Sequence, residues 1–387
     1  MSDAPINRRR DEFPTLAEGA YLLSHSLGPM PRGASASMQA YLDQWRTHTS
    51  EDAWASSWWE LSRAVGDRVA RVIGAEPGTV LPLPNATLAM AAIASCLDYH
   101  DRPKVVTTAL DFPSMGYLWR AQEALGAEVH VVPSEDGVTL DPDRLLSAID
   151  ERTGIVAISH VSYRSSFRVD AAAVARRARA VGALSLLDAY QSAGVCPIRA
   201  GDCGVDVLIA GSIKWLCGGP AAGYLYVRPD LVGSLQPRLT GWIAHENPFE
   251  FAHAPMRYAS DVRRFAQGTP VIPALYSVIP GLDIINDVGV EAIAAESRSR
   301  TQRIVEHALE RGWPLRSPTD PDRRGGTVML GFENPERCAE RLRAERVFVD
   351  WRPGVGIRLS PHFFNTDDEI SAALDAIGRL ADGGAPR

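Results

Sequence analysis

The segments "LSLLDAYQSAG" (residues 184–194) and "VDVLIAGSIKWLCGG" (residues 205–219) share one pattern, an apolar run followed by a single charged side chain. The first run ends at Asp188, and the second is followed by Lys214. Short apolar runs bounded by turn residues are typical of strands that are buried on both faces. A charge at the end of such a strand loses hydration, which is costly unless the charge is paired or given up. These two residues are therefore the first candidates for chemistry.

Outward from these segments, short apolar runs alternate with amphipathic helical stretches from about Leu81 to Val227. The runs "KVVTTAL", "EVHVVP" and "GIVAISHV" are separated by helical stretches such as "SMGYLWRAQEALGA". Strands that alternate with helices need crossover connections, so they form a mainly parallel sheet with helices on both faces. Ligands of such sheets bind outside the carboxyl ends of the strands. The residues just after each strand are therefore the place to look for a site.

The same patterns divide the chain into three parts. We expect residues 1–60 to be a segment that packs on the other domains, and residues 61–272 to form the large domain. Residues 273–387 begin with a long helical stretch and continue with the short strands "GTVMLGF" and "RVFVDW", which predicts a smaller α+β domain.

Two further strand ends carry candidates. Asn85 is a good helix cap, and the free N–H groups of the helix that starts at Ala86 and Thr87 suit a phosphate. Phe112 follows the run "KVVTTA" and is placed to stack on a flat ring. Ordinary explanations stay open for each feature, because most capped helices bind nothing and strand-end aromatics are often core. The aspartate can also cap its turn, and the lysine can extend along the surface to water.

The strand-end residues together suit a pyridine aldehyde. A desolvated lysine with a lowered pKa is the side chain that forms a Schiff base with a carbonyl cofactor. If a pyridine ring lies above the sheet, Asp188 is placed to keep its nitrogen protonated, and a protonated ring withdraws electrons from an amino acid's α-carbon. The occurrence of all four features at successive ends of one sheet is more specific than any one of them.

The composition argues against several other classes. The net charge of −7 gives no basic field to attract nucleic acid or anionic lipid. No apolar run approaches the roughly 18 residues of a membrane span, and the first residues lack the apolar core of a signal peptide, so we expect a cytoplasmic protein. The five cysteines show neither a CxxC pair nor the histidine spacing of a zinc site, so we expect reduced thiols and no metal.

Seven motifs spread over nearly the whole chain carry a family resemblance: "YLLSHSLGPMP", "DFPS", "DAYQSAG", "GSIKWLCGGPAAGYLYV", "TGWIAHENPF", "RFAQGTP" and "VDWRPGVGIRLSPHFFNT". In these motifs the chain resembles the class V aminotransferase group of fold type I pyridoxal-phosphate enzymes, and within it kynureninase-like proteins. The resemblance implies an α/β fold whose large domain has a mainly parallel seven-stranded sheet, with a smaller α+β C-terminal domain. It also implies pyridoxal 5′-phosphate as cofactor, a small amino-acid substrate, and a homodimer with active sites at the subunit interface.

The resemblance further implies roles for single residues. Lys214 would form the internal aldimine and shuttle the α-proton, and Asp188 would pair with the pyridine nitrogen. The other residues implied at the cofactor are Ala86, Thr87, Phe112, Gln191, Ser212, Trp242 and Thr269. Thr269 would reach the phosphate of the neighbouring subunit's cofactor. The residues implied at the substrate are His25, Ser26 and Arg358, whose guanidinium suits the α-carboxylate.

Four positions depart from the kynureninase pattern. Met115 stands where an aspartate is usual, Ile213 replaces a tyrosine, and Gln191 replaces a histidine. His25 stands where the pattern has an asparagine. Since the missing tyrosine and aspartate are polar groups near the cofactor and the leaving group, the resemblance supports cofactor binding more firmly than cleavage of kynurenine itself. No cysteine precedes Arg358 in "VFVDWRPGVG", which disfavours persulfide chemistry.

Other candidates lie outside these motifs. Trp54, Trp58 and Trp59 are close in sequence, and the spacing of the first two places them on one helix face. They either pack the N-terminal helices on the large domain or form a wall for a bulky substrate side chain. His160, at the end of "GIVAISH", is a candidate to face the cofactor.

The sequence thus predicts a pyridoxal-phosphate enzyme, with kynureninase-like cleavage at the β-carbon as the first hypothesis. Transamination, C–S lyase chemistry or epimerisation of a specialised amino acid are alternatives. A non-catalytic pyridoxal-phosphate-binding regulator is the hypothesis from another class. An arginine for the substrate carboxylate argues against it, because a pure binder has no use for one.

Overall fold

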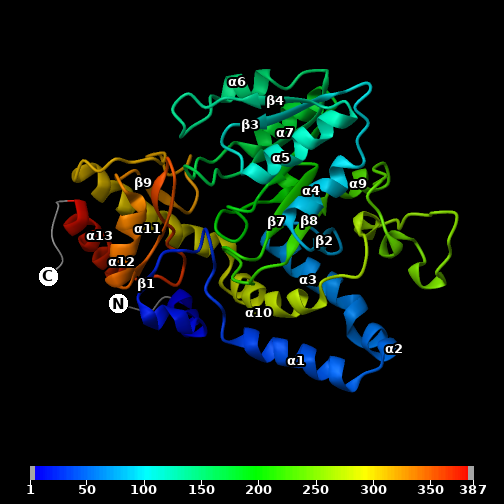
Figure 1. Cartoon of the computed structure of the whole chain (residues 1–387), viewed down its shortest axis with the longest axis horizontal. Helices are drawn as coiled ribbons and strands as arrows, with labels where there is room; N and C mark the ends of the chain where they lie inside the picture. The colour runs from blue at the N-terminus through cyan, green and yellow to red at the C-terminus, as the bar shows by residue number, and fades with distance from the viewer. Residues whose placement is uncertain (1–4, 382–387) are drawn as a thin grey trace.

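The computed structural model describes residues 5–381, and within them a seven-stranded sheet forms the centre (Figure 1). Its order is β2-β8-β7-β6-β5-β3-β4. All neighbouring pairs between β7 and β4 are parallel, and within this sheet β8 runs antiparallel to both of its neighbours. The expected mainly parallel seven-stranded sheet is therefore confirmed. Its strands are β2 (Val80–Leu83), β3 (Lys104–Thr108), β4 (Glu128–Val132), β5 (Thr153–Ser159), β6 (Leu184–Asp188), β7 (Val207–Gly211) and β8 (Gly223–Val227).

Helices cover both faces of this sheet, so its central strands are apolar throughout. In β7, Val207 and Ile209 belong to one core, and Leu208 and Ala210 to the other, because successive side chains point to opposite faces. The first core includes α4 (Ala86–Ala94) and α5 (Pro113–Ala121). The second includes α3 (Trp59–Val72), α7 (Ala171–Ala180) and α10 (Ile272–Val288). Shorter helices join the strands: α6 (Pro142–Ser147), α8 (Ala200–Cys203) and α9 (Pro229–Val232).

The C-terminal part has a small sheet and a core of its own. Strands β11 (Asp350–Arg352), β12 (Gly356–Leu359) and β9 (Val328–Leu330) pair antiparallel in this order. The helices that pack with them are α11 (Val290–Glu310), α12 (Pro335–Ala344) and α13 (Asp367–Ala381). The predicted strand "RVFVDW" is broken at Val349 into β10 (Val347–Phe348) and β11.

The N-terminal segment contacts both of these parts. Strand β1 (Ala20–Tyr21) pairs in parallel with β10, and α1 (Gly33–Thr47) packs along α10 (Figure 1). The short helix α2 (Ser50–Ala53) leads through a π-helical turn into α3. The domain boundaries stay predictions, and the chain ends at residues 1–4 and 382–387, assigned to the first and last parts, lie outside the described residues. Among the helices of residues 5–381, none has the length and apolar character that a membrane crossing requires.

Candidate active site

The carboxyl ends of β3, β5, β6 and β7 meet at one edge of the sheet, beside a cavity of about 340 Å³. The cavity gathers nine of the residues expected at the site: His25, Ser26, Ala86, Thr87, Phe112, Asp188, Gln191, Lys214 and Arg358. Ser212 and Trp242, also expected at the cofactor, do not line it, and neither does Thr269, which was expected at the cofactor of the neighbouring subunit. Met115 and Ile213, two of the departures from the kynureninase pattern, form part of its wall.

Lys214 follows β7 and lies among aromatic rings. Its Nζ is 4.8 Å from the ring centroid of Tyr190 and 5.8 Å from that of Phe112. Loss of hydration on burial lowers the pKa of Lys214 to about 8, while the charge of Asp188 acts in the opposite direction. Near neutral pH far more of this lysine is neutral amine than in an ordinary lysine. Lys214 can therefore act as a nucleophile and as a base.

Asp188 ends β6 and is 9 % exposed. Among the described residues only Tyr190 donates to its carboxylate, from the backbone N–H to Oδ1 at 2.8 Å. Burial raises the pKa of Asp188 above its ordinary value, and the Tyr190 N–H and the charge of Lys214 oppose this shift. A carboxylate with so few donors would be stabilised by a cationic partner in the cavity.

The N-terminus of α4 opens into the same cavity. Asn85 caps this helix, because its Oδ1 accepts a hydrogen bond from the Leu88 N–H at 2.9 Å. The first N–H groups of a helix have no partner within it, which leaves those of Ala86 and Thr87 available. Only glycine fits at Gly223, where a Cβ would lie 2.4 Å from the carbonyl carbon of Asn85. This turn suits a phosphate group.

Phe112 is held at the cavity by the residue before it. The carboxylate of Asp111 accepts hydrogen bonds from the N–H groups of Thr108, at 2.7 Å, and Ser159, at 2.6 Å. These two bonds tie together the ends of β3 and β5. The Phe112 ring is 45 % exposed and meets Tyr163 edge-on, with the centroids 5.1 Å apart. An apolar ring with this exposure is available to stack on a ligand.

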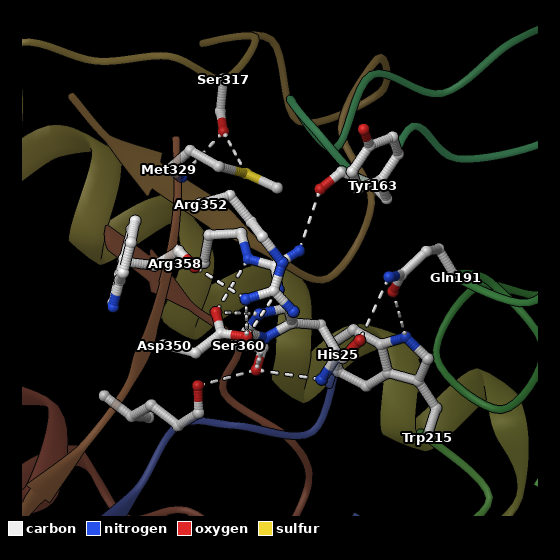
Figure 2. Close-up of polar contacts among 12 residues, drawn as sticks. His25, Tyr163, Gln191, Trp215, Ser317, Met329, Asp350, Arg352, Arg358 and Ser360 are labelled. Atoms are coloured by element: carbon white, nitrogen blue, oxygen red, sulfur yellow. Dashed lines mark hydrogen bonds and ion pairs between the residues drawn. The ribbon is translucent and has the colours of Figure 1, made fainter. Parts of the chain in front are cut away.

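Arg358 lies on β12, directly across the hairpin from Asp350 on β11 (Figure 2). Its Nε and Nη2 donate to the two carboxylate oxygens of Asp350 at 2.8 and 2.5 Å, and its Nη1 donates to the carbonyl oxygen of Tyr163 at 3.2 Å. Arg352 also lines the cavity, and its Nη1 lies 3.2 Å from Asp350. The sequence reasoning missed Asp350 and Arg352. The hairpin pattern of "VDWRPGVGIRL", which pairs opposite charges across two strands, was the available signal.

His25 and Gln191 are fixed by other protein groups. The ring nitrogens of His25 lie 2.6 Å from Ser360 Oγ and 2.8 Å from Asp350 Oδ1 (Figure 2). The amide nitrogen of Gln191 donates to the His25 carbonyl oxygen at 3.1 Å, and its oxygen accepts from Trp215 Nε1 at 3.2 Å. The N-terminal segment thus connects the arginine site of the small domain to the sheet edge of the large one.

The residues outside the cavity have other surroundings. Ser212 is fully buried, and its hydroxyl bonds to that of Tyr224. Thr269 lines a separate cavity of about 760 Å³ together with the three tryptophans at positions 54, 58 and 59. The Trp242 ring lies 6.1 Å from that of Trp54. Within one chain this aromatic cluster is therefore not a wall of the Lys214 cavity.

The expectation that His160 faces the site is wrong. Ser159, the last residue of β5, lines the Lys214 cavity, whereas His160 lines a different cavity of about 480 Å³. The physical reason is that neighbouring side chains of a strand point to opposite faces of the sheet.

Comparison with known proteins gives concordant similarities. The sequence model of the family described as aminotransferase class-V matches residues 20–349. An uncharacterized aminotransferase of Bacillus subtilis, YcbU, is 33% identical over 368 residues, which cover 95% of this chain and 96% of that protein. A kynureninase of Geobacillus thermodenitrificans is 28% identical, over 92% of this chain and 87% of its own length. Among solved structures, a cysteine desulfurase from Thermococcus onnurineus NA1 has the same fold, with a TM-score of 0.85 at 21% identity over 99% of this chain and 100% of that one.

Proposed function

The chain belongs to the class V aminotransferase family, a family of pyridoxal 5′-phosphate enzymes, and on that premise we propose that it cleaves a bond at the β-carbon of a small amino acid. This proposed activity is a lyase or hydrolase reaction like that of kynureninase. Two kynureninases, each 28% identical over more than 90% of this chain, support it.

The donor set at the cavity fits pyridoxal 5′-phosphate. The free N–H groups at the start of α4 would hold the phosphate, Asp188 the ring nitrogen, Phe112 one face of the ring, and Lys214 the aldehyde carbon. Asp188 makes no ion pair among the described residues, and its carboxylate would pair with the protonated ring nitrogen of the bound cofactor. When bound, the cofactor supplies a protonated ring that withdraws electrons from the substrate's α-carbon.

One observation carries the assignment of Lys214. Only two of the 40 Lys and Arg residues of the chain are lysines, Lys104 and Lys214. Lys104 forms an ordinary ion pair, with its Nζ 2.7 Å from Asp150. Arginine, which this chain uses almost everywhere else, stays protonated and cannot form a Schiff base. A lysine in the cavity opposite Asp188 is therefore best explained by amine chemistry.

The remaining steps follow from the chain's own groups. Arg358 would bind the substrate's α-carboxylate, which fixes the orientation of the bonds at the α-carbon. Lys214 would carry the α-proton, since its lowered pKa suits transfer in both directions near neutral pH. His25 and Ser26 line the same cavity, on the segment that leads from β1.

The residues of the cavity wall indicate what kind of side chain the amino-acid substrate carries. Met115 and Ile213 replace an acid and a phenol of the kynureninase pattern, and Met90 and Val161 also line the cavity. Neutral walls of this kind disfavour a charged side chain, because its desolvation would not be repaid. We propose an amino acid with an uncharged, apolar or aromatic side chain.

Transamination is the second candidate, favoured by the Bacillus subtilis aminotransferase at 33% identity. Turnover counting separates the two reactions. Without a keto-acid acceptor, β-cleavage is expected to continue for many turnovers per active site, whereas transamination stops after one. The measurement is product formed per site from a panel of uncharged L-amino acids that includes L-kynurenine. A stop at one turnover that pyruvate relieves would refute β-cleavage.

We also propose a homodimer whose active sites lie at the subunit interface. Trp242 and Thr269 do not line the Lys214 cavity of their own chain, so contact with a cofactor would require a second copy. Phe249 and Phe251, beside Trp242, are 52% and 70% exposed, which leaves an aromatic surface to be covered. Sedimentation equilibrium is expected to give twice the mass of one chain, and a Phe251→Asp variant is expected to give a lower mass.

The cytoplasmic location of the protein also stays a prediction.

A further inference from the structure

His25 departs from the kynureninase pattern, and both nitrogens of its ring have a protein partner. It is 1% exposed, although it lies on an irregular segment after β1. Its Nδ1 is 2.6 Å from Ser360 Oγ and its Nε2 is 2.8 Å from Asp350 Oδ1 (Figure 2). The backbone of His25 is fixed as well, because its N–H donates to Ser360 Oγ at 3.2 Å and its carbonyl accepts from Gln191.

The contact with Asp350 assigns the Nε2 hydrogen of the ring. Burial and the charge of Arg358 lower the pKa of His25 to about 4, while the hydrogen bond and the charge of Asp350 act in the opposite direction. Burial alone would raise the pKa of Asp350. The hydrogen bond from His25 and the charge of Arg358 nevertheless hold this pKa well below its ordinary range, so Asp350 is ionised. An ionised carboxylate only accepts, so His25 donates its Nε2 hydrogen to Asp350. The Ser360 hydroxyl, 2.6 Å from Nδ1, donates to the carbonyl oxygen of Leu22 at 2.8 Å.

The order hydroxyl, imidazole and carboxylate also occurs in hydrolase triads, but here it has another use. Ser360 is 0% exposed, so its oxygen cannot attack a substrate. The chain of hydrogen bonds instead ends at a carboxylate that holds two guanidinium groups, those of Arg358 and Arg352.

The geometry at Asp350 determines which edge of Arg358 is left for a ligand. Asp350 occupies the side edge of the guanidinium, formed by Nε and Nη2. Nη1 and Nη2 each have a second N–H besides the ones donated to Tyr163 and Asp350, and the end edge of the guanidinium lies between these two nitrogens. The two arginines and Asp350 together carry one net positive charge, which matches a single substrate carboxylate. Without a fixed Asp350, the two arginines would repel each other and Arg358 could turn.

We propose that His25 is a positioning residue that, by holding Asp350, presents the end edge of Arg358 to the substrate's α-carboxylate. The inference rests on the proposed function in one respect, the assignment of the α-carboxylate to Arg358. An asparagine at position 25 would be too short to span from Ser360 to Asp350. The hydrogen bond from His25 to Asp350 therefore stabilises the arginine site of this chain, and the asparagine of the kynureninase pattern would not make that bond.

Two substitutions form a matched pair for the test. In His25→Gln the side-chain amide can take the place of Nε2 and donate to Asp350, whereas in His25→Asn it falls short. We expect His25→Asn to weaken the binding of propionate to the holoenzyme about tenfold and His25→Gln to weaken it less than threefold. The measurement is an NMR chemical-shift titration of ¹⁵N-labelled holoenzyme with propionate, which needs no amine chemistry.

A second titration tests whether the effect is specific to the carboxylate. The visible band of the cofactor is followed with L-alanine and with L-alaninamide, which lacks the carboxylate. We expect His25→Asn to weaken the response to L-alanine by about the same tenfold factor and to leave that to L-alaninamide within twofold. Equal loss for the two ligands would show general damage and would overturn the inference.

The other outcomes are also decisive. Equal propionate affinity in the wild type and in His25→Asn, or no propionate binding by the wild type, would overturn the inference. If the cofactor band responds to no amino acid of the panel but propionate binding still depends on His25, the proposed function fails and the inference stands. Recovery in His25→Gln together with loss in His25→Asn supports a positioning role over a merely structural one.

Discussion

Replacing Lys214 with alanine is expected to abolish the visible absorption band of the Schiff base between this lysine and the cofactor and to lower turnover by about 10³-fold or more. The reason is that Lys214 supplies both the covalent attachment and the base, and no other lysine lies in the cavity. The measurement compares spectra of the wild type and Lys214→Ala before and after L-kynurenine is added. The phosphate contacts at α4 are untouched, so the variant is expected to bind the cofactor without that bond.

The two-lysine composition of the chain provides a matched control. Borohydride reduction of the wild type is expected to label one peptide only, the one with Lys214, and Lys104→Arg is expected to keep both label and activity. Lys104 begins β3 and can be replaced by arginine while the ion pair with Asp150 is kept. A label on Lys104, or a Lys214→Ala protein that retains the band, would contradict the assignment.

Replacing Asp188 with asparagine is expected to leave cofactor binding in place but to lower turnover by about 10³-fold. Asparagine has nearly the same size and can still accept the Tyr190 N–H, so the fold is preserved. It carries no charge, however, and cannot keep the pyridine nitrogen protonated. The measurement is the rate of product formation by variant and wild type at saturating cofactor, with the bound cofactor quantified separately.

The same substitution has an opposite effect on the protein without cofactor. The pKa of Asp188 is raised in the folded state, so above its ordinary pKa the native protein binds more protons than the unfolded chain, and stability falls as pH rises through this interval. At neutral pH the buried carboxyl group therefore destabilises the apoprotein, and Asp188→Asn removes this effect. The variant apoprotein is expected to melt at the same or a higher temperature. A melting temperature several degrees lower would assign Asp188 a structural role instead.

Much of the candidate site could be predicted because its residues lie at the ends of strands. In a parallel sheet the order of the strand ends follows from the alternation of strands and helices, and Phe112, Asp188 and Lys214 each stand at or just after such an end. The capped helix at Asn85 is equally local, since cap and helix are neighbours in the sequence. The structure gathers all of these positions around one cavity, as expected.

The wrong placement of His160 has a physical origin in the buried strands. Strands such as β5 and β7 are apolar on both faces, so their sequences show no alternation that would tell one face from the other. A shift of one residue decides whether Ser159 or His160 lines the Lys214 cavity, and the sequence contains no signal for it.

The amino-acid sequence by itself determined the sheet, the helices on its two faces and the chemical character of the strand ends, because these depend on local periodicity and on residue type. Only the tertiary structure brought His25 to Asp350, 325 positions away, and Asp350 to Arg358. That meeting depends on the pairing of β1 with β10 and on the β11–β12 hairpin, which are long-range contacts between short strands. Such contacts are set by the summed packing of the whole chain, and no short segment of sequence encodes them.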